Sequence, residues 1–332
     1  MTMDRLAEAG FGWHESRIWV TRVETSPSRN RQTPSSVSTR VRRFSTCLAI
    51  QHRHMSKLRP LRENHPTFKP FVLGGTHIRD LPSAGDHAPD RLIISMPWSF
   101  NDEPERKYPV VYLCDGYWDF PLMWAMYSHL LFDKVVPEYT LVGLAYGGEK
   151  PDVDALRLKD LAPPDAKSVE QGTDYLSRLE NSIIPFIEDE YAGDPTFRCI
   201  AGASIGGAFA LSALFRKPGL FQAAIALCPR ADAHGRQLHK DEDVFFRAGR
   251  TLGSTLLGRR KELPARIFLA AGGEDDPRIT GAIEEFNEIL DARHYRFLEK
   301  QYRVIDGEKH GALKPEGFNR GLRHVFAELA KT

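Results

Sequence analysis

The sequence predicts an α/β protein with a mostly parallel central sheet and helices on both faces. The first observation is a set of apolar, β-branched runs without polar alternation, such as "YPVVYLCDG" at 108–116. Strands that are buried on both faces have this composition. The second observation is that segments with helical spacing separate these runs, which is typical of parallel strands joined by helical crossovers.

The elements follow in chain order. "RLIISMP" (91–97) is expected to be a strand, and 108–116 is a buried strand that stops at an Asp-Gly turn. A third strand is expected at 139–148, and the apolar spacing of 168–191 predicts a helix. The remaining expected strands are 198–203, 223–229, 265–273 and 301–307, and the remaining helices are 206–218, 279–294 and 315–330.

Composition narrows the classes of protein. The chain is 42% hydrophobic and 27% charged, with a formal net charge of +1, so neither nucleic acid nor a membrane is expected as a partner. The four cysteines form no CxxC pair, which fits a reducing compartment better than a disulfide framework. No run of about 18 apolar residues exists, and we expect a cytoplasmic location.

The first 62 residues differ from the rest. They hold 12 Lys/Arg against 4 Asp/Glu, and no acidic residue lies between Thr25 and Arg62. We expect residues 1–62 to be a basic, Ser/Arg-rich, disordered leader and residues 63–332 to form one catalytic domain with a small excursion at 230–263. An organelle transit peptide is the alternative to a non-structural extension, with Met55 as a candidate start; we favour the extension.

Gly202-x-Ser204-x-Gly206 matches a nucleophile elbow, in which a serine stands on a sharp strand-to-helix turn. Glycines two residues on either side remove Cβ atoms that would clash in this turn. By chance the pattern arises in roughly one chain in ten of this length. Here an apolar strand precedes it and a small-residue helix follows it, so we predict that Ser204 is a nucleophile and that the N–H of Ile205 is an oxyanion donor.

A nucleophilic serine needs a base and a group that orients the base. His310 is the histidine that follows both the serine and a candidate acid and lies in a loop after a strand. The acid is one of three adjacent carboxylates after the 265–273 strand: Asp275 is preferred, Glu274 is second and Asp276 third. A second oxyanion donor, the N–H of Tyr117, is expected in the loop after 108–116.

Together these residues resemble the Putative esterase family of α/β-hydrolases, which includes esterase D-like enzymes and ferric-siderophore esterases. The resemblance runs from about Arg91 to the C-terminus. It rests on "YPVVYLCDGYWDF", "RLKDLAPP", "AGASIGGAFALSALFRKPGLFQAAIALCP" and "EKHGALKPEGFNRGLRHVF". It implies an α/β-hydrolase fold, a Ser204–Asp275–His310 triad, and Tyr117 and Ile205 at the oxyanion hole.

The sequence departs from the family around the substrate pocket. Ala203 stands where the family often has His, and "LCPRADAHGR" lacks the Trp pair that commonly follows the 223–229 strand. The substrate specificity of family members therefore cannot be assumed for this chain. Trp118, Tyr146 and Arg230 are the candidate pocket residues, and for each of them ordinary packing remains an open alternative.

The predicted function is hydrolysis of small-molecule carboxylic esters through a Ser-Asp-His triad and an acyl-enzyme, without a cofactor or a metal. No GxGxxG or Walker loop precedes a helix, and no His, Cys and carboxylate cluster has ligand spacing along the chain. An acyltransferase or a thioesterase similar to S-formylglutathione hydrolase is the alternative on the same triad. A non-catalytic binding protein on this scaffold is a further alternative, and a homo-oligomer is left open.

Overall fold

A computed structural model describes residues 71–82, 87–162, 174–230, 236–248 and 261–331. All of them belong to one compact unit, Phe71–Thr332. The expected leader (1–62) lies outside the described residues, as do the 231–235 and 249–260 parts of the expected excursion. The described part of that excursion holds helix α8 (Arg236–Ala248).

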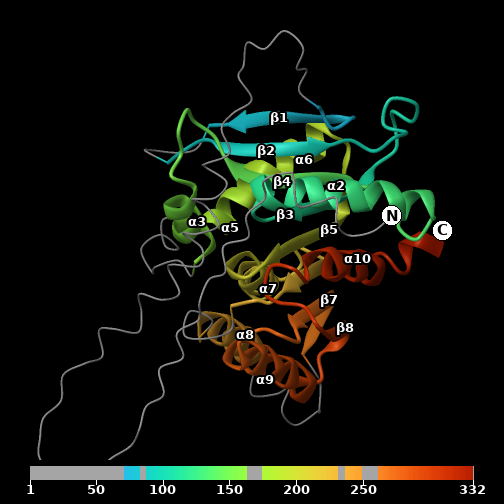
Figure 1. Ribbon diagram of the computed structural model, residues 1–332. Coiled ribbons are helices and arrows are strands. Elements are labelled where there is room, and N and C mark those ends of the chain that lie inside the picture. The colour runs from blue at the N-terminus through green and yellow to red at the C-terminus, as the bar shows by residue number, and fades with distance from the viewer. Residues whose placement is uncertain (1–70, 83–86, 163–173, 231–235, 249–260, 332) are drawn as a thin grey trace, which may run out of the picture. The chain divides into compact units, whose positions relative to one another are not determined.

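The core of the fold is an eight-stranded sheet in the order β1-β2-β4-β3-β5-β6-β7-β8 (Figure 1). The six strands from β4 to β8 in this order pair in parallel, and β1 and β2 are antiparallel at one edge. The predicted mostly parallel sheet is therefore confirmed. The strands are β1 Thr76–Leu81, β2 Asp90–Ser95, β3 Tyr108–Leu113, β4 Thr140–Tyr146, β5 Gly193–Ala203, β6 Ala223–Leu227, β7 Glu262–Gly272 and β8 Arg296–Ile305.

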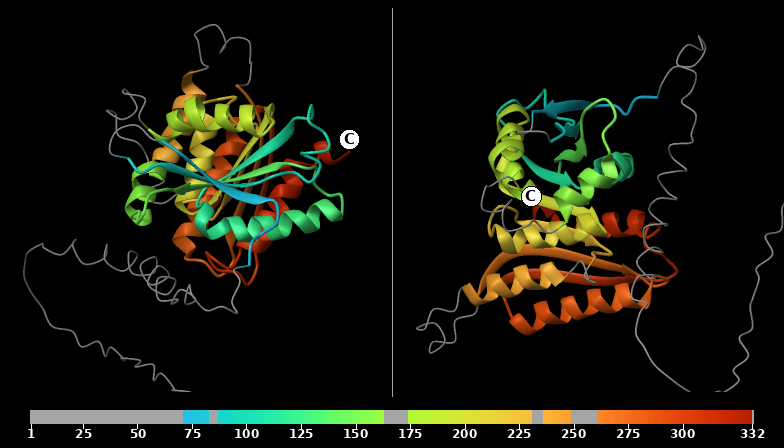
Figure 2. Two further views of the ribbon diagram at one scale, coloured as in Figure 1. Left: turned by 90° about the horizontal axis from the view of Figure 1, so that it is seen from above. Right: turned by 90° about the vertical axis from the view of Figure 1, so that its left-hand side faces the viewer.

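Helices cover both faces of the sheet (Figure 2). One buried cluster joins the sheet to α2 and α10, and a second joins it to α5, α6 and α7. The principal helices are α2 Gly116–Phe132, α3 Val153–Leu161, α5 Tyr175–Arg178, α6 Ile184–Glu190, α7 Ile205–Arg216, α9 Pro277–Arg293 and α10 Lys314–Val325.

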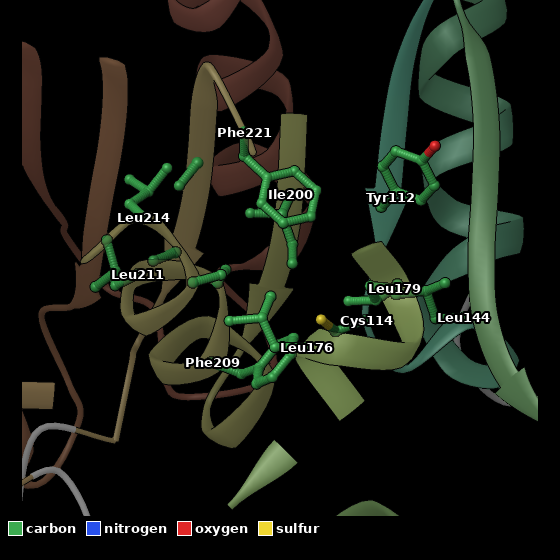
Figure 3. Close-up of a cluster of buried hydrophobic side chains, with 14 of the residues drawn as sticks. Tyr112, Cys114, Leu144, Leu176, Leu179, Ile200, Phe209, Leu211, Leu214 and Phe221 are labelled. Atoms are coloured by element: carbon green, nitrogen blue, oxygen red, sulfur yellow. The ribbon is translucent and has the colours of Figure 1, made fainter. Parts of the chain in front are cut away.

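The strands do not alternate between polar and apolar residues because helices cover both faces of the sheet. Every residue of β4 is buried, as the run "TLVGLAY" predicts. Figure 3 shows one of the two interfaces, where Phe209, Leu211 and Leu214 of α7 meet strand side chains such as Ile200. Gly207 lets α7 lie close to the sheet, because a Cβ there would lie 3.1 Å from the carbonyl oxygen of Gly202 and 3.2 Å from that of Leu227.

The structure differs from the sequence prediction at three local elements. The expected helix at 168–191 is described from residue 174 and contains a π-helical turn, Leu179–Ile183, between α5 and α6. The segment after 108–116 is not a loop, because α2 begins directly at Gly116. The edge strand β1 was not predicted, since its burial pattern is largely exposed and it lacks an apolar signature.

Among the described residues, the helices are too short or too polar for any of them to cross a bilayer.

Candidate active site

The candidate residues converge on one edge of the sheet. Ser204 directly follows β5, Asp275 comes three residues after β7, and His310 comes five residues after β8. These strands are parallel neighbours of β6 or of each other, so their carboxyl ends meet at the same edge. The segment after β3 joins them there, because β3 pairs in parallel with β5.

Ser204 has the backbone of an elbow. Its φ of 57° and ψ of −120° are strained for a residue with a Cβ, and α7 begins at the next residue. Its N–H donates to the carbonyl of Leu227 at 2.8 Å. A Cβ on Gly202 would lie 2.6 Å from the backbone carbon of Gly206, and one on Gly206 would lie 2.9 Å from Cβ of Cys114. Both glycines are therefore sterically required.

Among the three candidate acids, Asp275 is the one that contacts the histidine. Its Oδ2 lies 3.0 Å from Nδ1 of His310. Asp276 caps α9 through the N–H of Arg278, and hydrogen bonds from Arg278 lower the pKa of its carboxyl to about 2. Glu274 is exposed and is held by its backbone N–H to the carbonyl of Glu308.

The Asp275 loop and the His310 loop pack against each other through a glycine. A Cβ on Gly272 would lie 2.5 Å from the carbonyl oxygen of Glu308, and the N–H of Gly273 donates to the carbonyl of Ile305. The contact requires glycine at this position. It sets the separation of the two loops and hence of the two side chains that they carry.

A buried thiol also contacts the acid. Cys228, directly after β6, donates from Sγ to Oδ2 of Asp275 at 3.2 Å. Burial raises the pKa of this thiol, so it stays protonated and can donate. The sequence pattern of Cys228 did not predict this contact. Its only signal was its position at the end of a strand next to the nucleophile strand.

The donors of Cys228, Asp275 and His310 all lie within 4.8 Å of one another, which is the spacing of a candidate metal site. The absence of ligand spacing along the chain therefore did not predict the arrangement in space. These donors come from three different strand ends, 35 and 47 residues apart.

The two predicted oxyanion donors lie in the first turns of helices, where backbone N–H groups have no intrahelical acceptor. Ile205 begins α7, and Tyr117 is the second residue of α2. Asp115, with φ of 60°, makes the left-handed turn that starts α2. Gly116 permits the close approach, since a Cβ there would lie 2.7 Å from the backbone of Gly143 in β4.

A buried ion pair supports this turn. Arg157 of α3 donates to both carboxylate oxygens of Asp115, at 2.5 and 2.8 Å, and both side chains are almost fully buried. A Cβ on Gly206 would lie 3.0 Å from Oδ2 of Asp115, so the carboxylate also packs against the elbow. The pair thus joins α3 to both turns of the site. Arg157 belongs to the "RLKDLAPP" motif, but nothing in the sequence pattern predicted its role at this turn.

A second ion pair connects α2 to the segment after His310. Lys314, the first residue of α10, donates to both oxygens of Asp119 at 2.9 and 3.0 Å. Burial raises the pKa of the Asp119 carboxyl, and the ammonium of Lys314 opposes that effect.

The three pocket candidates have different surroundings. Trp118 is half-buried and its ring lies 5.6 Å from the guanidinium carbon of Arg157. Tyr146 is buried, and its carbonyl accepts the hydroxyl of Tyr117 at 3.1 Å. Arg230 is half-buried and its N–H donates to the carbonyl of Ser204 at 3.1 Å. Their role in substrate binding stays a prediction.

The parallel sheet, the covering helices and the strand-to-helix elbow define the α/β-hydrolase fold. The chain belongs to the Putative esterase family, whose model matches residues 90–312. It is a carboxylic ester hydrolase.

Known proteins resemble the chain over most of its length. It is 27% identical to the ferri-bacillibactin esterase BesA of Bacillus subtilis over 287 residues, which cover 80% of this chain and 94% of that protein. The BES protein of Bacillus cereus has a TM-score of 0.64 at 21% identity and covers 78% and 97% of the two chains. The siderophore hydrolase EstB of Aspergillus nidulans has a TM-score of 0.62 at 20% identity, covering 78% and 98%.

Proposed function

We propose that this ester hydrolase is a serine esterase with Ser204 as nucleophile, His310 as general base and Asp275 as the acid that orients it. The observation that carries the proposal is the 3.0 Å contact between Asp275 and His310 at the sheet edge where Ser204 occupies a strained elbow. A serine, a carboxylate and an imidazole in this chain order are typical of the fold.

In the acylation step, His310 takes the proton of Ser204 as the hydroxyl attacks the ester carbonyl. Asp275 holds the imidazole with its proton on Nδ1, so that Nε2 can accept. The N–H groups of Ile205 and Tyr117 stabilise the negative charge that develops on the carbonyl oxygen, and each such donor typically contributes about 10² to 10³ in kcat.

Acylation ends when His310 gives this proton to the leaving alcohol and the acyl group stays on Ser204. In deacylation, water attacks the acyl-enzyme with His310 again as base, and His310 then returns the proton to Oγ of Ser204 as the acid product leaves. The Arg157–Asp115 pair supports this chemistry indirectly, because it fixes the turn that carries Tyr117.

We propose siderophore esters as the substrate class. This rests on the names of two relatives, a ferri-bacillibactin esterase and a siderophore hydrolase. A ferric siderophore is bulky and polar, and Arg230 lies next to the proposed nucleophile, because its N–H donates to the carbonyl of Ser204 at 3.1 Å. We therefore assign Arg230 as a specificity residue, with Trp118 and Tyr146 as further lining residues.

The test compares Ser204→Ala with Ser128→Ala, a serine of α2 that donates to its own helix at the carbonyl of Trp124. Hydrolysis of p-nitrophenyl acetate, butyrate and octanoate should fall by about 10⁶ in the first variant and stay near wild type in the second. A fluorophosphonate should modify Ser204 in the wild type. Activity retained by Ser204→Ala would refute the assignment.

A second experiment addresses the substrate. Ferri-bacillibactin should be hydrolysed with a higher kcat/KM than p-nitrophenyl acetate, and Arg230→Gln should raise the KM for the siderophore alone. Equal kcat/KM for the two esters would refute the substrate class while leaving the triad in place. Including methanol as acceptor distinguishes transfer from hydrolysis by the ratio of methyl ester to free acid.

A further inference from the structure

The cluster of Cys228, Asp275 and His310 brings together three kinds of metal donor. Oδ2 of Asp275 lies 3.2 Å from Sγ of Cys228 and 3.0 Å from Nδ1 of His310, and one donor atom from each residue lies within 4.8 Å of the others. Around a tetrahedral Zn²⁺ with bonds of about 2.0–2.3 Å, donor atoms lie roughly 3.3–3.8 Å apart. The two separations that involve Oδ2 need to widen by only a few tenths of an ångström to bind an ion, and Sγ and Nδ1, which are at most 4.8 Å apart, need to approach by up to about 1 Å.

We propose that Cys228, Asp275 and His310 form a binding site for a thiophilic divalent cation, Zn²⁺ or Cd²⁺, that switches the active site off. The mixed sulfur, nitrogen and oxygen set favours these ions over Mg²⁺ and Ca²⁺, which prefer oxygen ligands. The site uses the same imidazole and carboxylate as the proposed triad. Binding and hydrolysis therefore exclude each other.

The charge of the site favours a dication. Cys228 is fully buried and the side chain of Asp275 is 9% exposed, so a thiolate beside this carboxylate would be unstable alone. A bound M²⁺ neutralises both negative groups. In the binding step the thiol releases its proton to solvent and its sulfur bonds the metal, with no change in oxidation state. The side chain of His310, at 37% exposed, is the accessible member through which an ion would enter.

Inhibition follows from the protons on the imidazole. The nitrogen of His310 that lies beside Asp275 is Nδ1. When a neutral imidazole coordinates a metal through Nδ1, Nδ1 gives up its proton to solvent and Nε2 takes one up, so the single proton of the ring is then on Nε2. Nε2 is the nitrogen that must accept the proton of Ser204, so the metal-bound histidine has no free acceptor. This inhibition rests on the proposed function, whereas metal binding itself does not.

Binding is measured by the ultraviolet thiolate-to-metal charge-transfer absorption of Cd²⁺ on the full chain with Cys47→Ser, which removes the thiol of the leader. One Cd²⁺ per chain should produce the band. Cys228→Ser should abolish it, because a hydroxyl keeps the hydrogen bond to Asp275 but is a poor ligand for a soft metal; Cys228→Ala is the second variant. His310→Ala should weaken Cd²⁺ binding at least about tenfold.

Cys199→Ala is the matched control, because Cys199 is equally buried but its Sγ lies near a backbone carbonyl, 3.9 Å from that of Ile200. This variant should keep the band. So should Ser204→Ala, which makes the binding result independent of any esterase activity. A band that persists in both Cys228 variants would overturn the site.

The activity arm uses Zn²⁺ and p-nitrophenyl butyrate. Zn²⁺ should inhibit the wild type reversibly, with recovery on addition of EDTA, whereas Mg²⁺ should have no effect. The Cys228→Ser variant should need at least about tenfold more Zn²⁺ for half inhibition. Full activity at a Zn²⁺ concentration that saturates the site would overturn the switch.

Discussion

Replacing Asp275 with asparagine tests the triad, because an amide cannot accept all the hydrogen bonds that this carboxylate accepts. Oδ1 of Asp275 accepts the N–H of Asp276 at 3.0 Å, and Oδ2 accepts from Cys228 and His310. An amide has one oxygen, so it cannot accept all three hydrogen bonds. If its oxygen stays beside His310, its NH₂ faces the N–H of Asp276. If the amide turns over, its NH₂ faces Nδ1 of His310.

The second orientation gives the larger effect on catalysis. The amide then donates to Nδ1, which moves the imidazole proton to Nε2, where it blocks transfer from Ser204. In a serine protease the same change costs about 10⁴ in kcat. At about 1.36 kcal/mol per factor of ten, this is about 5.4 kcal/mol of transition-state stabilisation. The free energy of unfolding should fall by only about 1–3 kcal/mol, the cost of one unsatisfied polar group.

The assay is kcat for p-nitrophenyl butyrate, with urea unfolding measured on the same preparations. Asp276→Asn is the matched control, since Asp276 caps α9 and does not contact His310. It should keep kcat within about threefold, because an asparagine also caps a helix. An Asp275→Asn variant that loses less than about tenfold, or an Asp276→Asn variant that loses as much, would refute the assignment of the acid.

Three further predictions follow from particular contacts. Gly202→Ala places a Cβ 2.6 Å from backbone and should lower the free energy of unfolding in urea by about 1–3 kcal/mol or more. Gly281→Ala in α9, where a Cβ meets nothing within 4 Å, should raise that free energy by about 0.5–1 kcal/mol. Equal shifts in the two variants would contradict the clash. Tyr117→Phe should keep kcat within about threefold, because the proposed donor is a backbone N–H; a loss of about 10² would assign the role to the hydroxyl. Lys314→Met leaves the buried Asp119 unpaired and should cost about 3–5 kcal/mol at pH 8. Burial raises the pKa of the Asp119 carboxyl, and this substitution removes the charge that opposes the rise, so the folded state binds more protons than the unfolded state. The stability penalty should therefore shrink as the pH falls toward 4. A penalty that stays constant with pH would contradict this reasoning.

The features that depend on local pattern could be predicted from the amino-acid sequence. Continuous apolar runs identified the buried strands, because a strand covered on both faces has no polar side. The elbow at Ser204 was also predictable, since the glycines that flank it, the strand before it and the helix after it are all contained in about 20 consecutive residues.

The prediction was incomplete where a local pattern was weak or fitted several residues. The Asp-Gly pair after β3 is a turn signal, and it concealed the fact that α2 starts at once with Asp115 in a left-handed conformation. For the three adjacent carboxylates after β7, the sequence favoured Asp275 but left Glu274 and Asp276 open. In the structure they differ in their partners, because Asp275 contacts His310 and Asp276 caps α9.

The partners of these side chains depend on contacts between distant parts of the chain. The order of the strands in the sheet places Asp275 next to His310, 35 residues away, and next to Cys228, 47 residues away. It likewise pairs Arg157 with Asp115, 42 residues apart. Periodicity reports which face of its own element a side chain occupies. Which side chain of another element it meets depends on strand order and loop packing, which are set by the whole buried core.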